Sequence, residues 1–500
     1  MTGDTSESRP GEMSLSWHRA VAVASGVLSM AALLPFTARP IQWDEFVYMD
    51  LAFRPAPSAW LLNRYAHIYA MVPFMKLAGD PYVGARLYWC FLVGLCVGAV
   101  VRAALSEPGR RRTWTVALAL LLLAGQEALF AYPGIVFADY GLMAVATVAF
   151  CFVWARLARG DDLGGREAAI VGLLFLLAAK TKESALPLLI ISLVLVIAPS
   201  GRVRLDRAAM RLAGWWLVGI ALGIAVIAVL DAAIVGDPWF SLRPSSWREA
   251  LAFYFPDVID IPKIYVRLFW LREPYFYTMF APYLFGGLIW IVRERDARRL
   301  VLYALPAAFV GQLALLDAIG RLDFVSRYLV PVLPIQSLLT ATAFARLRQE
   351  RSRGFARLAA DALILGLVLV GLPPAWHVAK SLAQRTVQHT GEARWAGFYE
   401  VARAVAPAPA ATFFVSTNLY GGEIRINTLG PLARMNFNLP LAPQQIVVGP
   451  EPVANADYAA VTVDEYRRWF APRGLLPEQV VFSHDGAVAL VCTRSACARR

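Results

Sequence analysis

Two adjacent carboxylates, Asp44 and Glu45, follow the first long apolar run and lead into a second apolar stretch. A carboxylate held at a membrane surface can act as a general base on a hydroxyl if it is ionised and within hydrogen-bond reach. Nearby cations such as Arg54 or Arg327 would keep it ionised. The same cations could hold a departing phosphate. Adjacent carboxylates on a helix point to different sides, so we expect Asp44 and Glu45 to have different partners.

The composition is that of a membrane protein. Hydrophobic residues make up 58% of the chain, charged residues only 17%, and the mean hydropathy is +0.53. Soluble domains are far more polar. The net charge of +12 is carried mostly by arginines in short loops between apolar runs, as the positive-inside rule requires. Because no nucleic-acid motif is visible, we expect membrane lipids and no nucleic acid as partners.

Eleven apolar segments approach the roughly 20 residues that a helix needs to cross the hydrocarbon core. They cover residues 17–37, 81–104, 113–131, 138–157, 167–181, 183–199, 212–235, 276–293, 300–318, 327–346 and 357–374. The pair 167–181 and 183–199 is short and is split by charged residues. The sequence therefore predicts an α-helical polytopic membrane protein with about 11 transmembrane helices over 1–374.

The arginines predict the orientation of these segments. With the N-terminus inside, each cytoplasmic loop carries three to five arginines, whereas the outer turn 132–137 carries none and the outer turn 319–326 carries one. This asymmetry favours a cytoplasmic N-terminus in the inner membrane. We interpret residues 1–16 as a cytoplasmic tail before a retained helix, because no small-residue cleavage site follows. An odd number of spans places the C-terminal segment in the periplasm.

Two long outer loops, 38–80 and 236–275, connect these segments. The first contains two apolar stretches with scattered polar residues that read as interfacial helices. The second is rich in aromatic residues and carries Lys263 and Arg267. It is either an aromatic belt at the interface or a lid that contacts sugar and phosphate.

Most ionisable residues within or beside the apolar runs fall at predicted outer helix ends. They are Glu127, Asp139, Lys180, Lys182, Glu183, Asp231, Asp317 and Arg327. Ionisable groups in a membrane are costly and mark function by default. For Asp231 and Asp317, snorkelling to water remains an equal alternative.

Residues 375–500 have the composition of a small soluble α/β domain. We expect a helix at 392–405, strands at 412–417, 424–429, 444–449, 458–463 and 488–493, and a helix at 463–471. In a periplasmic domain Cys492 and Cys497 could form a disulfide, although two free thiols remain an alternative. The other cysteines lie in apolar runs, and no zinc-type spacing is present.

Four segments carry a family resemblance. They are 43–89, with an Asp-Glu pair, a basic-Pro-rich stretch and a Gly-x-x-x-x-x-Ala-Arg-Leu helix start, then YPGIVFADYGLM at 132–143, LAAKTKESALPLL at 177–189 and SRYLVPVLP at 326–334. In this order, the segments resemble GT-C glycosyltransferases of the protein O-mannosyltransferase and aminoarabinose transferase group.

The resemblance implies transfer of a sugar from a polyprenyl-phosphate donor to an acceptor on the outer face, with inversion. By matching position Asp44 would be the catalytic base and Asp139 a second active-site acid that orients acceptor or sugar. Arg54, where the family usually has lysine, would contact the lipid phosphate. Glu45 would orient the loop.

The remaining substrate-binding candidates are Lys182, Glu183, Arg327, Tyr328, Lys263 and Arg267. We expect no cofactor and no metal. The acceptor could be a glycan, a lipid or a protein.

Three alternatives stay open. A transporter or flippase of a lipid-linked sugar would often show repeated halves and helices broken at mid-membrane, and we find no internal repeat. Another envelope polysaccharide ligase or polymerase would use a different charged outer loop. A scaffold without activity would not need its carboxylates.

Overall fold

The structure is a computed structural model of the 500-residue chain. It describes residues 15–36, 48–49, 52, 64–79, 81–130, 137–161, 163–197, 206–244, 280–293, 297–318, 326–350, 361–362, 364–366, 368–369, 376, 380, 412–416, 418, 446–449, 451, 456–482, 486 and 488–493.

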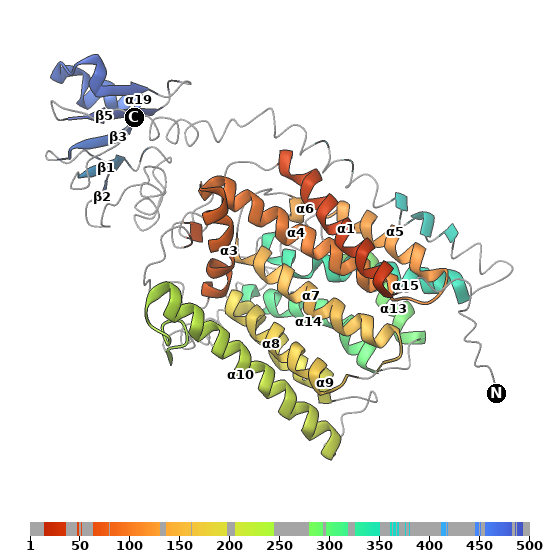
Figure 1. Ribbon diagram of the computed structural model, residues 1–500. Coiled ribbons are helices and arrows are strands. Elements are labelled where there is room, and N and C mark those ends of the chain that lie inside the picture. Colours follow the sequence, from red (N-terminus) through yellow and green to blue (C-terminus); the bar gives the residue numbers. More distant parts are fainter. Residues whose placement is uncertain are drawn as a thin grey trace, which may run out of the picture.

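Long helices form the bulk of the molecule (Figure 1). In chain order the helices of this bundle, including the single turn α6, are α1 (Leu15–Leu33), α3 (Tyr65–Ala78), α4 (Pro81–Leu105), α5 (Arg111–Ala124), α6 (Glu127–Phe130), α7 (Ala138–Ala158), α8 (Gly165–Thr181), α9 (Leu186–Ile197), α10 (Arg207–Val235), α13 (Ala281–Arg293), α14 (Ala297–Ala318) and α15 (Leu333–Glu350). Every predicted apolar segment from 17–37 to 327–346 overlaps a helix, which confirms the predicted helical membrane class.

Five helices in the described part of the chain are long and apolar enough to cross a membrane. They are Val83–Leu105, Ala138–Ala158, Arg207–Val235, Arg299–Asp317 and Tyr328–Arg348. Two further apolar helices, Glu183–Ile197 and Ala281–Val292, are shorter. The predicted total of eleven spans stays a prediction, because the last segment, 357–374, falls only partly within the described residues.

The structure interrupts one predicted span and separates one predicted pair. The segment 113–131 divides at Gly125 and Gln126 into α5 and the short α6. The pair 167–181 and 183–199 is separated at Lys182, whose backbone is extended (φ −157°, ψ 136°), and a 3₁₀ turn at Glu183–Ala185 precedes α9. Pro187 then lies in the first turn of α9, where a missing N–H is tolerated. These breaks free backbone and side chains at one end of the bundle.

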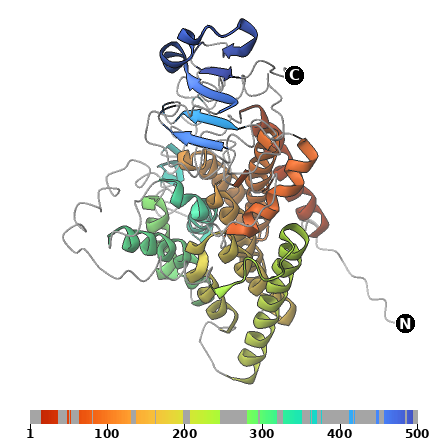
Figure 2. The ribbon, with the colours of Figure 1, turned by 90° about the vertical axis from the view of Figure 1, so that its left-hand side faces the viewer.

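Helix α10 packs along α8 at the edge of the bundle (Figures 1 and 2). Its inward face carries two glycines, Gly219 and Gly223, among larger buried side chains, and a Cβ added at Gly219 would lie 1.9 Å from the Ala169 carbonyl oxygen. Its outward face exposes large apolar side chains, among them Leu217, Leu222 and Val229. A helix that approaches its neighbour closely at glycines and exposes apolar side chains on its other face fits a peripheral span that meets lipid.

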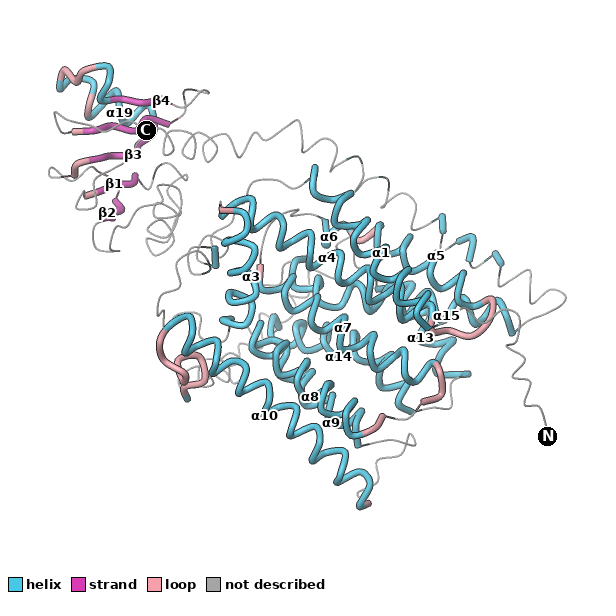
Figure 3. The backbone as a smooth tube through the Cα atoms, in the orientation of Figure 1, coloured by secondary structure: helices cyan, strands magenta, loops and turns pink. Residues whose placement is uncertain are grey.

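The strands form one five-stranded sheet outside the helical bundle (Figure 3). They are β1 (Phe413–Ser416), β2 (Ile446–Gly449), β3 (Tyr458–Thr462), β4 (Val480–Phe482) and β5 (Val488–Cys492), in the order β2-β1-β3-β5-β4. β1 runs parallel to β2 and β3, whereas β5 is antiparallel to β3 and β4.

Helix α19 (Val463–Trp469) follows β3 directly, and Thr462 with Glu465 forms a capping box at its start. The same Glu465 carboxylate accepts hydrogen bonds from Ser416 and Asn418, which joins the helix start to the end of β1. Four predicted strands and the helix at 463–471 are thus confirmed, and β4 was not predicted. The predicted strand at 424–429 and helix at 392–405 lie outside the described residues.

Cysteines also divide between the two parts of the chain. Cys90, Cys96 and Cys151 are buried free thiols, as expected of core residues. Cys492, at the end of β5, is disulfide-bonded. Its predicted partner, Cys497, lies outside the described residues.

The contact between α8 and α10 can be tested with one methyl group. We expect Gly219→Ala to lower the melting temperature of the protein in detergent micelles, because its Cβ would clash with the α8 backbone. Gly214→Ala in the same helix is the matched control, since nothing lies within 4 Å of its added Cβ. That variant should be neutral or stabilising by up to about 1 kcal/mol. Equal melting temperatures for the two variants would contradict this packing.

Candidate functional site

A buried ion pair joins the α8–α9 break to the start of α7. The Lys182 Nζ lies 2.5 Å from the Asp139 Oδ1, and the two residues are only 7% and 4% exposed. Asp139 is in the first turn of α7, where the helix dipole favours a negative charge. The Lys182 ammonium also lies over the Tyr328 ring, 4.4 Å from its centroid. One cation therefore links α7, the α8–α9 break and the 3₁₀ helix Ser326–Val332.

The next residue, Glu183, faces a different element. Its carboxylate accepts two hydrogen bonds from the Arg64 guanidinium, at 2.8 Å from Nη2 and 3.3 Å from Nε. Arg64 immediately precedes α3 and also donates to the Tyr48 hydroxyl at 2.5 Å. Burial alone would lower the pKa of Arg64, but the charge of Glu183 and these hydrogen bonds raise that pKa well above its usual value. Arg64 is thus a fixed charge between the first outer loop and α9.

A second buried polar chain lies beside these pairs. Asp231, in the last turn of α10, accepts a hydrogen bond from the Tyr69 hydroxyl at 2.5 Å. Its other oxygen accepts from the Ser241 backbone N–H at 2.9 Å and hydroxyl at 2.8 Å. The Lys180 ammonium donates to the Ser241 carbonyl at 2.5 Å. This chain connects α3, α8 and the turn after α10.

Aromatic rings fill the space between the polar groups. His67 is 1% exposed and packs edge-on against Tyr48. Its Nδ1 lies 3.2 Å from the Tyr88 hydroxyl. Gly141 allows this approach, since a Cβ there would lie 2.4 Å from the His67 Nδ1 and 2.9 Å from the Thr181 Cγ2. The start of α7 is therefore fitted closely against α3 and the end of α8.

Four of the sequence-predicted residues, Asp139, Lys182, Glu183 and Tyr328, lie at this one end of the bundle. Arg327 precedes Tyr328 in the same 3₁₀ helix. The other predicted residues lie outside the described part of the chain; they are Asp44, Glu45, Arg54, Lys263 and Arg267. Their roles stay predictions.

Snorkelling is the wrong interpretation for two carboxylates. Asp231 is 0% exposed and Asp317 is 3% exposed, so neither side chain reaches water. Asp231 instead joins the polar chain of Tyr69 and Ser241. Sequence reasoning left this alternative open because both residues stand near helix ends, where the pattern does not reveal which way a side chain turns.

The sequence also missed some members of the site. Arg64, Tyr69 and Ser241 lie in stretches that read as apolar or aromatic outer loops, so nothing nearby in sequence signalled a buried partner. The sequence did contain one signal for these partners. Lys182 and Glu183 are adjacent and oppositely charged, and when both leave water each needs its own partner of opposite charge.

The arrangement offers a fixed carboxylate at the edge of a polar cluster. Lys182 occupies the Asp139 Oδ1, and the Asp139 Oδ2 has no protein partner within the described residues. That oxygen could accept a hydrogen bond from a hydroxyl. Within the same residues no group of three His, Cys, Asp or Glu side chains gathers as a metal site.

The ion pair between Asp139 and Lys182 makes a quantitative prediction. Asp139→Ala should destabilise the protein by about 3–5 kcal/mol, because it leaves a buried ammonium without its partner. The double variant Asp139→Ala/Lys182→Met should recover most of that loss. Asp237→Ala is the matched control, since it removes an exposed ion pair with Arg243 and should cost no more than about 1 kcal/mol. Thermal unfolding in detergent micelles measures all four proteins, and similar losses for Asp139→Ala and Asp237→Ala would exclude a tightly buried pair.

Comparison with known proteins gives similarity in structure alone. No family model matches this sequence, and no curated protein matches it. The structure of ArnT from Cupriavidus metallidurans bound to undecaprenyl phosphate matches with a TM-score of 0.57 and 15% identity, over 97% of this chain and 99% of that one. The apo state of the same protein matches with a TM-score of 0.52 and 17% identity, over 96% and 98%.

A third match is the Archaeoglobus fulgidus oligosaccharyltransferase tethered with an acceptor peptide. It has a TM-score of 0.50 and 12% identity, over 90% of this chain and 69% of that chain. These proteins are GT-C glycosyltransferases. Since the likeness to ArnT extends over nearly the whole of both chains, this chain has the GT-C fold of a polytopic membrane protein, as its sequence resemblance implied.

Proposed function

We propose that this protein transfers a sugar from a polyprenyl-phosphate donor to an acceptor hydroxyl at the periplasmic face of the inner membrane, with inversion. The observation that carries the proposal is the charged cluster of the buried Asp139 and Lys182 with the partly buried Glu183 and Arg64, in a chain with the GT-C fold. A similar structure was determined with undecaprenyl phosphate bound, and another with a tethered acceptor peptide. A lipid-linked donor suits this side of the membrane, where nucleotide sugars are absent.

The chemistry needs alignment and charge stabilisation more than strong acid catalysis. A polyprenyl phosphate is a good leaving group, so the acceptor oxygen has only to be deprotonated and aligned with the anomeric carbon. Asp44 takes the acceptor proton as general base, the oxygen attacks the anomeric carbon, and the bond to the phosphate breaks. The inverted sugar is then on the acceptor and the charge on the polyprenyl phosphate.

Cations stabilise the phosphate as its charge develops. Arg54 and Arg327 are the cations we assign to this contact, with Lys263 and Arg267 from the second outer loop completing it. Asp139 orients the acceptor or the sugar through the oxygen that Lys182 does not bind. The Tyr328 ring lies beside the Lys182 ammonium, and its flat apolar face can pack against the sugar.

Glu183 and Arg64 have a supporting role in this scheme. Their bidentate pair ties the start of α3, and hence the loop that carries Asp44, to the α8–α9 break. Arg-carboxylate pairs of this kind fix orientation as well as distance. Glu45 orients the same loop. Catalysis then depends on how firmly the first outer loop is held.

The orientation in the membrane is part of the proposal. The positive-inside pattern places the N-terminus in the cytoplasm and residues 375–500, as a small α/β domain, in the periplasm. The disulfide-bonded state of Cys492 supports an oxidising compartment for that domain.

The first test is Asp44→Asn in the full-length protein. We expect sugar transfer to fall by about a hundredfold or more, since general-base catalysis contributes roughly 10²–10⁴. Glu45→Gln is the matched control and should retain transfer within about tenfold. Turnover is measured as the loss of sugar from the polyprenyl phosphate. The glycan and lipid profiles of cells that lack the protein identify the acceptor. Normal turnover by the Asp44→Asn protein, correctly inserted, would remove this residue from the base role.

The same assay separates the alternatives. A flippase would move the lipid-linked sugar across the bilayer without consuming it, and its activity would survive Asp44→Asn. We favour transfer because the charged cluster gathers at one end of the bundle, whereas transporters place their sites near the bilayer midplane.

The second test concerns topology. A reporter that is active only outside the cytoplasm should be active when fused after Arg500. The same reporter should be silent when fused after Arg353, in the segment 346–357 that carries five arginines and that the sequence predicts to be cytoplasmic. A reporter that is silent after Arg500 and active after Arg353 would show that the proposed orientation is wrong.

A further inference from the structure

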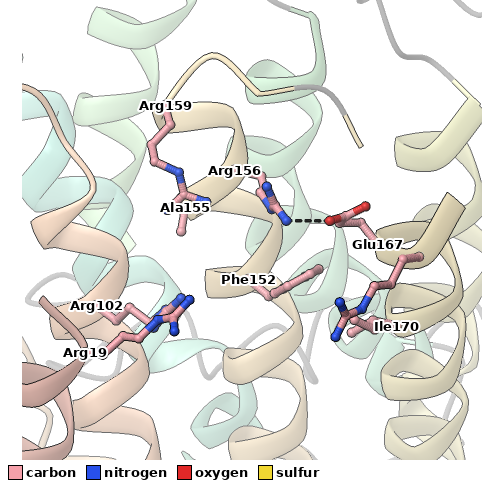
Figure 4. A pocket seen from close by; sticks show the side chains of 9 residues that line it. Arg19, Arg102, Phe152, Ala155, Arg156, Arg159, Glu167 and Ile170 are labelled. Atoms are coloured by element: carbon pink, nitrogen blue, oxygen red, sulfur yellow. Dashed lines mark hydrogen bonds and ion pairs between the residues drawn. The ribbon is translucent and has the colours of Figure 1, made fainter. Parts of the chain in front are cut away.

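A cavity of about 270 Å³ lies at the other end of the same helices, away from the candidate site. Five arginines contribute to its lining: Arg19, Arg102, Arg156, Arg159 and Arg166. They come from α1, α4, the end of α7 and the start of α8 (Figure 4). The proposed catalytic function uses none of them.

Helix α7 forms the floor of this arginine cavity. Its last turns supply Phe152 and Arg156, and the loop start supplies Arg159. Helix α1 packs on α4, and α4 packs on α7; α1 and α4 together form one wall with Arg19 and Arg102. The first turns of α8 form the opposite wall. The cavity is therefore built by the fixed packing of transmembrane helices and not by a surface loop.

The positive charge in the cavity is only partly balanced. Arg156 forms ion pairs with Glu167 and, at 3.4 Å, with Asp161. Arg159 pairs with the same Asp161 at 3.1 Å.

The other three arginines, Arg19, Arg102 and Arg166, have no carboxylate partner in the described part of the chain. Like charges gathered in one cavity repel each other, and a bound anion would reduce that repulsion. The cavity therefore favours an anionic ligand.

The cavity also has an apolar component. Phe152 and Ile170 line it together with the arginines. From Ala158, the end of α7, back to Phe152 the helix rises about 9 Å. Apolar groups thus lie deeper along the helices than the arginines at their ends. A ligand that fits has a negative head and an apolar body.

We propose that this cavity binds the phosphate headgroup of an anionic phospholipid. In the orientation proposed above the cavity faces the cytoplasm; basic cavities between transmembrane helices on that side suit such headgroups, and that leaflet carries the anionic lipids. Arginine suits phosphate because its guanidinium presents several donors in a plane. Arginines that served orientation alone would project separately into water, whereas these converge on one cavity.

Native mass spectrometry of the full-length protein in detergent tests the proposal, with cardiolipin, phosphatidylglycerol and phosphatidylcholine as probes. We expect the two anionic lipids to bind more tightly than phosphatidylcholine. Arg102→Gln/Arg166→Gln should weaken anionic lipid binding by about tenfold or more, since each basic group near a membrane surface contributes roughly fivefold. Arg102→Lys/Arg166→Lys keeps the charges and should stay close to wild type.

Arg207→Gln/Arg211→Gln is the matched control, because both arginines are exposed on α10, outside the cavity. Equal loss of binding in this control would show diffuse attraction and overturn the site. Unchanged binding in Arg102→Gln/Arg166→Gln would overturn it as well.

Competition with inorganic phosphate distinguishes the source of the anion, and phosphate binding without any preference for anionic lipid would overturn the lipid assignment. Melting curves identify a variant that fails to fold. If the glutamine variant fails to fold, the comparison of lipid binding between Arg102→Lys/Arg166→Lys and the wild-type protein decides the test.

Discussion

Two consecutive charges at a helix break organise one end of this protein. Inside a membrane protein a charge has to be paired, because removing one partner leaves an uncompensated ion away from water. Lys182 and Glu183 meet this constraint in different directions, since the extended backbone of Lys182 separates their side chains. Lys182 reaches α7 through Asp139, and Glu183 reaches α3 through Arg64. Three elements are thereby fixed to one another by charges rather than by apolar packing alone.

This arrangement favours preorganisation. A group that acts in catalysis has to be held within a fraction of an ångström, and buried hydrogen-bonded partners provide that restraint. Asp139 is restrained by the ammonium of Lys182, which in turn lies over Tyr328. His67, packed between Tyr48 and Tyr88, also lies directly against Gly141 in the first turns of α7. The cluster is therefore suited to orienting a substrate that arrives from the lipid.

The sequence predicted elements better than partners. The length of the apolar runs predicted the helices, and the charges at 180–183 predicted the turn between α8 and α9. Short apolar runs predicted most strands. All of these signals are local in the sequence. The pairing of Arg64 with Glu183 joins residues 119 positions apart, and that of Tyr69 with Asp231 joins residues 162 apart. No periodicity connects such positions, so these contacts emerge only from tertiary packing. The break at Gly125 and Gln126 was missed because the apolar residues before and after it together reach the length of one span, which hid the polar Gln126 and Glu127. β4 is only three residues long, too short for alternation to be visible.

Helix length relates the two ends of the molecule. From Asp139 to Arg156, α7 rises about 26 Å, close to the roughly 30 Å thickness of the hydrocarbon core. Lys180 and Arg166 on α8 are about 21 Å apart by the same measure. The candidate site and the arginine cavity therefore lie at opposite ends of α7 and α8, separated by a distance comparable to the thickness of the hydrocarbon core. A helix that spans the bilayer once can thus present an ion-paired carboxylate to one leaflet and an excess of arginine to the other. The single register of α7 against α4 and α8 sets the geometry of both.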